Sequence, residues 1–203
     1  VQLGPNNPTQ GWDWCSGYHY SDSLLIGFAH THLSGTGIGD LGDILFMPLS
    51  GDYTPVITEE KPYDWQAKYL HEDEKAEAGY YSINIKKYKV KAELTATDRV
   101  GFHKYDFQGE GNSKVLIDLK YGTGWDQVIK AEIKQVDSNS IEGLRFSSGW
   151  AADQRVFFYT KFSKDIKNFD IVHEDPELGQ LTAIVEFEGN GVFHSTTSDQ
   201  GVG

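Results

Sequence analysis

Short apolar runs that alternate with polar residues recur along most of this 203-residue chain, and they constrain its fold more than any other feature. The clearest run spans residues 89–97, where charged or polar neighbours alternate with Val90, Ala92, Leu94 and Ala96. A period of two places alternate side chains on opposite faces of a strand, so this run predicts a half-buried β-strand. Similar strands are predicted at residues 81–85, 129–133 and 169–171.

Three further runs are more continuously apolar and predict strands that lie between two layers, at residues 115–119, 156–162 and 183–187. Glycine, asparagine, aspartate and charged turns separate about a dozen such strands, a spacing typical of a large sandwich. Helical periodicity is weak, and only residues 64–78 allow a turn or two. We therefore predict an all-β fold, a large antiparallel β-sandwich with little helix, as a single domain over residues 1–203.

The charge balance excludes several classes of partner. Eighteen lysines and arginines against thirty aspartates and glutamates give a net charge of −12, which repels phosphate backbones and anionic membranes. No nucleic-acid partner is expected. No apolar run approaches the roughly 20 residues of a membrane-spanning helix, so no such segment is expected either. The one cysteine, Cys15, has no partner for an intrachain disulfide.

Residues 12–20 concentrate aromatic and histidine side chains between glycines, namely Trp12, Trp14, Tyr18, His19 and Tyr20. Such a loop is able to form a stacking platform for a sugar ring, with polar edges for its hydroxyl groups. An aromatic plug that closes one end of the sandwich is an equally good interpretation. A small buried thiol is the favoured interpretation of Cys15 over a nucleophile.

Residues 30–43 hold two histidines, His30 and His32, at a spacing that puts both on one face of a strand. With Asp40 or Asp43 they suggest a metal site, but structural histidines are the favoured interpretation. Residues 71–79 are rich in carboxylates, yet they lack the pattern of a calcium-binding loop and read as a solvated acidic turn. No residue pair stands out as a general acid and base, so we expect no catalytic and no metal-binding residue in this chain.

Four blocks of the chain resemble one known family: WDWCSGYHY at 12–20, GFAHTHLSGTG at 27–37, residues 79–103, and IEGLRFSSGWAADQ at 141–154. In order and spacing they resemble the N-terminal domain of glycoside hydrolase family 92. This family comprises calcium-dependent, exo-acting α-mannosidases found widely in gut Bacteroidetes. The resemblance extends over about residues 1–187.

The resemblance implies a sandwich that packs on a larger C-terminal (α/α)₆ barrel, with the active site at the junction. The barrel is expected to supply the general acid, the general base and most of the calcium site for an inverting reaction on a mannose-containing glycan, as in N-glycan degradation. This chain alone is then inactive. Trp12 resembles the tryptophan that packs beside the leaving-group sugar, and the other residues expected to line the junction are Cys15, Tyr18, His19, His30 and His32.

Two regions depart from the family pattern. Residues 189–203 read as a Gly-, Ser- and Thr-rich tail where the family continues into a strand, and the start lacks a Gly-rich loop that family members carry upstream. The resemblance implies a periplasmic or secreted bacterial protein. If residues 4–51 normally dock on a barrel, they should expose an apolar patch.

Two other functions remain open at the level of the sequence. The chain is alternatively a free-standing carbohydrate-binding module that uses Trp12 and Trp14 as its platform. A third possibility is a structural domain that only shields the barrel.

Overall fold

The regular secondary structure of the chain is almost entirely β in a computed structural model that describes residues 6–8, 12–15, 17–31, 39 and 41–202. These residues form fourteen strands: β1 (Leu24–Leu25), β2 (Leu45–Ser50), β3 (Ala67–Lys68), β4 (Glu74–Glu77), β5 (Tyr80–Ile85), β6 (Val90–Ala96), β7 (Val100–Phe107), β8 (Ser113–Asp118), β9 (Gln127–Asp137), β10 (Ser140–Ser148), β11 (Gln154–Phe162), β12 (Ile166–Asp175), β13 (Gln180–Phe187) and β14 (Gly191–Val202). Three short 3₁₀ turns complete the described elements, at Trp12–Trp14, His71–Asp73 and Lys86–Tyr88.

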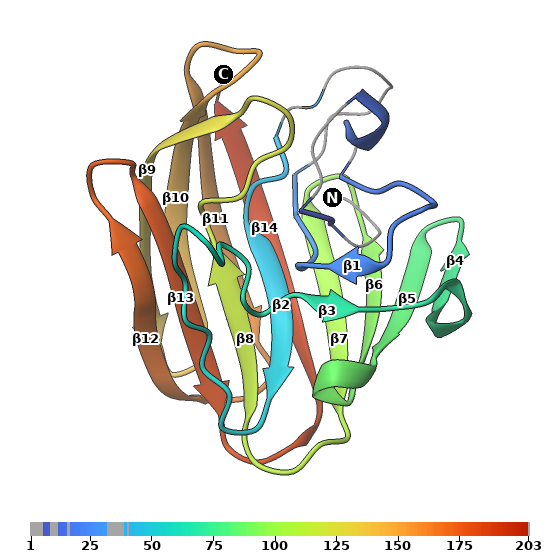
Figure 1. Cartoon of the computed structure of the whole chain (residues 1–203). Coiled ribbons are helices and arrows are strands. Elements are labelled where there is room, and N and C mark those ends of the chain that lie inside the picture. Colours follow the sequence, from blue (N-terminus) through green and yellow to red (C-terminus); the bar gives the residue numbers. More distant parts are fainter. Residues whose placement is uncertain (1–5, 9–11, 16, 32–38, 40, 203) are drawn as a thin grey trace.

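Two large antiparallel sheets pack face to face, as Figure 1 shows. The larger sheet has eight strands in the order β4-β5-β6-β7-β14-β11-β10-β9, and the smaller has four in the order β12-β13-β8-β2. The short strands β1 and β3 form a separate pair. This architecture confirms the predicted all-β sandwich. The only helical structure within residues 64–78 is the turn at His71–Asp73.

Aromatic rings fill the space between the sheets. Phe193 of β14 stacks on Phe107 of β7 at a centroid distance of 5.2 Å, and it contacts Phe187 of β13 at 4.6 Å. All three side chains are buried, and each contributes about 2–3 kcal/mol to the hydrophobic driving force. β8 is buried along its whole length, as its continuous apolar run predicts.

The prediction for residues 189–203 is wrong, because most of this segment is β14, which lies between β7 and β11 in the larger sheet. Phe193, Ser195 and Thr197 point into the core, and the Thr197 hydroxyl lies 2.9 Å from that of Thr160 on β11. Small polar residues face inward here, so the segment has the strand period without the apolar composition that usually marks a strand.

The prediction for residues 156–162 also needs correction. Every second residue of β11 is exposed, so this strand has one face in the core and one face in solvent. The outward side chains include Phe157 and Tyr159, and their aromatic character gave the run a continuously apolar appearance. No helix in the described ranges is long and apolar enough to cross a membrane.

Candidate functional site

Trp12 is the most exposed large apolar side chain among the described residues, with 74% of its surface accessible. It begins a 3₁₀ turn whose last residue, Trp14, donates its indole N–H to Asp22 Oδ1 at 2.7 Å. The other oxygen of Asp22 accepts the backbone N–H of His19 at 2.7 Å. Asp22 thus anchors the loop, in which Trp14 is half-buried while Trp12 is exposed.

Tyr18 lies on the partly buried carboxylate of Glu74, within the acidic segment at residues 71–79. Its hydroxyl donates to Glu74 Oε1 at 3.1 Å, Tyr81 donates to Oε2 at 2.7 Å, and His71 Nδ1 lies 2.5 Å from Oε1. Burial, with Glu74 next, raises the pKa of Tyr18 to about 12. The hydrogen bond to Glu74 raises the pKa of His71. Residues 71–77 are therefore an anchor for the aromatic loop as well as an acidic turn.

His19 and Tyr20 lie at the surface of the same loop. His19 is half-buried, and its Nδ1 lies 2.7 Å from the hydroxyl of Ser21. Tyr20 is exposed and stacks on His71 at a centroid distance of 4.1 Å with the two planes 3° apart. Within the described part of residues 4–51, the exposed large apolar side chains are Trp12 and Tyr20. The expected apolar patch is thus confined to these two aromatic rings.

His30 lies in the core, 1% exposed, and does not reach the surface of the loops. Its Nδ1 lies 2.7 Å from the carbonyl oxygen of Ile44, and its ring stacks on that of His103. Burial lowers the pKa of His30 to about 4, so the ring is neutral at pH 7. Cys15 is also buried. His32 lies outside the described residues.

Arg145 of β10 forms the centre of a buried charge cluster that the sequence does not reveal. Its guanidinium forms ion pairs with Asp43 and, at 2.6 Å, with Asp126, and its Nε donates to the carbonyl oxygen of Leu119 at 2.9 Å. All three charged side chains are fully buried. Burial alone disfavours the charged guanidinium, but the two carboxylates outweigh it and hold the pKa of Arg145 above its usual value. Burial raises the pKa of Asp126 despite the attraction of Arg145.

The charge cluster joins two connections at one end of the sandwich. Asp43 precedes β2, and Asp126 ends the connection from β8 to β9. The two connections touch at Gly39 and Gly124, where a Cβ on Gly39 would lie 2.9 Å from the Cα of Gly124. Gly124 also has a φ of +66°, so glycine is required there for both reasons.

Trp125 and Trp150 lie next to this cluster. Their ring centroids are 6.1 Å apart with the planes at 45°, and 51% and 65% of their surfaces are exposed. Figure 1 shows that the connection from β8 to β9 and the β10–β11 loop lie at the end of the sandwich where the N-terminal segment lies. Sequence reasoning missed this pair, although two tryptophans in glycine-containing loops were a detectable signal.

The described residues show no metal-binding cluster, and the two carboxylates of the charge cluster are already paired. No three His, Cys, Asp or Glu side chains gather among them in a way that would hold a metal ion. Asp43 and Asp126 share the guanidinium of Arg145, which already supplies their positive partner. Both carboxylates are closed to solvent, so a sugar cannot reach them.

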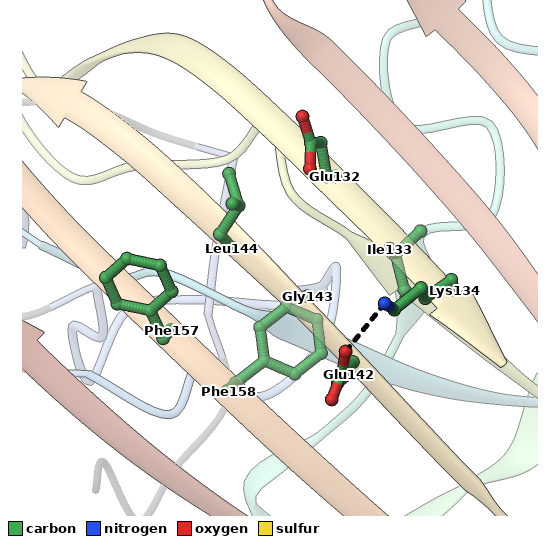
Figure 2. Close-up of a pocket in the computed structure, with 8 residues that line it drawn as sticks. All are labelled: Glu132, Ile133, Lys134, Glu142, Gly143, Leu144, Phe157 and Phe158. Atoms are coloured by element: carbon green, nitrogen blue, oxygen red, sulfur yellow. Dashed lines mark ion pairs between the residues drawn. The ribbon is translucent and has the colours of Figure 1, made fainter. Parts of the chain in front are cut away.

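A hollow of about 500 Å³ lies on the larger sheet between β9, β10 and β11 (Figure 2). Its lining includes Leu144, Phe157 and an ion pair of 2.9 Å between Lys134 and Glu142. None of the residues expected at the junction lines it. It is a shallow feature of the sheet, separate from the aromatic loops.

Comparison with known proteins gives one consistent result. The family model described as the glycosyl hydrolase family 92 N-terminal domain matches residues 1–200. The structure of a family GH92 α-mannosidase from Bacteroides thetaiotaomicron superposes with a TM-score of 0.84 at 28% identity, over 98% of this chain and 29% of that one. No curated protein matches this chain.

A second structure from Bacteroides thetaiotaomicron VPI-5482, described as a family GH92 inverting mannosidase, has a TM-score of 0.75 at 21% identity, over 97% of this chain and 26% of that one. This second match supports the assignment of the fold. The chain thus spans between a quarter and a third of the length of these relatives. Because the family model covers nearly the whole chain, this protein belongs to glycoside hydrolase family 92, as its N-terminal domain.

Proposed function

We propose that this chain is a sandwich domain that supplies sugar-contacting side chains, Trp12 foremost, to an α-mannosidase whose catalytic groups lie in a separate C-terminal (α/α)₆ barrel. The observation that carries the proposal is the exposed indole of Trp12 on a loop held by Asp22, in a chain of this family. An aromatic ring exposed at the surface suits the apolar face of a pyranose. The six candidate residues therefore differ in role according to their exposure.

Trp12 is the residue in direct contact with the leaving-group sugar, and Tyr18 and His19 shape the loop beside it. Cys15 and His30 are buried, so they act from beneath the surface without touching the sugar. His32 remains a candidate for the same junction. The reaction is inverting, and calcium is bound by the catalytic barrel. The chain is one sandwich domain, and the whole enzyme is a periplasmic or secreted bacterial protein acting on mannose-containing glycans.

The proposal predicts that the 203-residue chain alone does not hydrolyse α-1,2-mannobiose in the presence of calcium. Turnover comparable to that of an intact family member would contradict the proposed function. In an intact enzyme that carries this domain, Trp12→Ala should lower kcat/KM about tenfold, the loss expected when one stacked ring is removed. An unchanged kcat/KM would instead favour a domain that only shields the barrel.

A free-standing carbohydrate-binding module is the second candidate, favoured by the same exposed indole. Isothermal titration calorimetry of the chain with α-mannosides separates the two. A module binds with micromolar affinity on its own, whereas a domain that supplies part of a site binds only at millimolar sugar concentrations.

A further inference from the structure

We propose that Trp125 and Trp150 form a second sugar-contacting surface, which takes the outer residues of a mannose-containing oligosaccharide beyond the sugar at Trp12. The inference rests on the proposed function and extends it from one sugar ring to a longer chain. It is carried by the position, support and surroundings of the two indoles.

Strand register places the two tryptophans together. Gln127, the first residue of β9, pairs with Ser148, the last residue of β10. Trp125 lies two residues before that pair and Trp150 two residues after it, so both emerge at the same end of the sheet. Their rings are 6.1 Å apart at 45°, which gives two adjoining faces that are not coplanar. A bent oligosaccharide is able to lay consecutive rings on such faces.

The buried charge cluster of Arg145, Asp43 and Asp126 holds the connection that carries Trp125 in place. Asp126, the neighbour of Trp125, is ion-paired at 2.6 Å with Arg145, three residues before Ser148 in β10. A Cβ on Gly122 would collide with the Asp126 carboxylate, so the turn is tightly packed against the pair. In the β10–β11 loop, the backbone N–H of Gly149 donates to the carbonyl oxygen of Ala151 at 2.9 Å. A preorganised aromatic surface loses little entropy when a ligand binds.

The surface is linked to the loop of Trp12 through a backbone contact. Gly39 packs against Gly124, and a Cβ on Gly39 would also lie 3.5 Å from the Cα of Cys15, three residues after Trp12. Four aromatic side chains of the described ranges are more than half exposed: Trp12, Tyr20, Trp125 and Trp150. All four belong to the N-terminal loops or to the two connections at the same end of the sandwich (Figure 1).

The surroundings favour a glycan over a docked protein. Apart from Trp125 and the buried Leu119 and Tyr121, the residues of the β8–β9 connection are small or polar, and the β10–β11 loop contains Trp150 between glycine and alanines. A protein interface of useful size requires a broader apolar patch. In addition, Asp153 at the end of this loop and Arg155 at the start of β11 form an exposed ion pair of 2.8 Å. The carboxylate accepts hydrogen bonds from hydroxyls and the guanidinium donates to them.

The test uses the five indole N–H signals of the ¹⁵N-labelled 203-residue chain in two-dimensional NMR. Trp65 is buried with its indole bonded to the carbonyl oxygen of Ile26, so it serves as an internal control. We expect α-1,2-mannobiose to shift the Trp12 signal and α-1,2-mannotetraose to shift those of Trp125 and Trp150 as well. Cellotetraose, which contains no mannose, should shift none of them.

The outcomes separate the inference from the proposed function. A shift of Trp12 alone with every mannoside would overturn the inference and leave the proposed function standing. Shifts of Trp125 and Trp150 without Trp12 would support the inference and count against the role of Trp12. The absence of any shift at millimolar mannotetraose would overturn both.

Variants provide a second readout. Trp125→Ala and Trp150→Ala should each weaken mannotetraose binding about tenfold and leave mannobiose binding unchanged. Phe157→Ala is the matched control, because this ring is exposed on β11 away from the two loops, and it should change neither affinity. An equal loss for both sugars, or none for either, would contradict the inference. Unchanged mannotetraose binding together with weaker association of a separately expressed catalytic barrel would point to protein docking instead.

Discussion

The imidazole rings of His30 and His103 stack in the core at a centroid distance of 4.6 Å with their planes 22° apart. Each has its Nδ1 within 2.7 Å of an oxygen, the carbonyl of Ile44 for His30 and the hydroxyl of Tyr105 for His103. Burial lowers the pKa of both, to about 4 for His30, and His30 lowers that of His103 further. Both rings are therefore neutral in the folded protein, and their protonation at acidic pH opposes folding.

This arrangement predicts a loss of stability between pH 6.5 and pH 4. Unfolded histidines have a pKa of about 6.5, so below that pH the unfolded state binds protons that the folded state refuses. The free energy of unfolding should fall by up to about 1.4 kcal/mol per pH unit for each histidine, and be unaffected by the pair above pH 6.5. Urea denaturation at a series of pH values measures it. His103→Asn should reduce the slope by about half, and an unchanged slope would refute this role.

Arg145→Met should destabilise the chain by about 3–5 kcal/mol, because it leaves Asp43 and Asp126 buried without a positive partner. Denaturant midpoints measure the change. Arg155→Met is the matched control, since its ion pair with Asp153 is exposed, and it should have little effect. Adding Asp43→Asn and Asp126→Asn to Arg145→Met should recover part of the loss. Equal effects of the two arginine variants would contradict the importance of burial.

Gly124→Ala should destabilise the chain more than Gly189→Ala, although both glycines have a φ of +66°. At Gly189 a Cβ meets nothing within 4 Å, so only the backbone strain of about 1–2 kcal/mol applies. At Gly124 the Cβ would also collide with the carbonyl of Gly39. The difference in thermal unfolding temperature between the variants isolates that contact. Similar temperatures would mean that the two connections do not pack as described.

Glu74→Gln should lower the pKa of His71, because the hydrogen bond to Glu74 is the main cause that raises it. An NMR titration of the His71 ring protons measures the change. Glu77→Gln, which removes an exposed partner of Lys75, is the matched control and should leave His71 unaffected. The same Glu74 variant should loosen Tyr18, detectable as a shift of its ring signals.

The sequence predicted the sandwich because burial on one face of a strand leaves a period of two in the order of residues, as in β6 and β5. β14 was not predicted, because Ser195 and Thr197 occupy inward positions where the usual strand pattern has apolar residues. In the candidate site, the aromatic and histidine content of residues 12–20 was enough to single out the loop around Trp12. The Arg145 cluster was not, because Asp43, Asp126 and Arg145 are far apart in the sequence and meet only through sheet register.

The position of β14 has a consequence for biosynthesis. This strand follows every other strand of the larger sheet along the chain, yet it joins β7 on one side to β11 on the other. Until it leaves the ribosome, the larger sheet exists as two separate halves, β4–β7 and β9–β11, each with an open edge that invites pairing with another chain. A released chain that ends near residue 190 should therefore depend on chaperones and aggregate readily, whereas a chain that includes β14 closes the sheet.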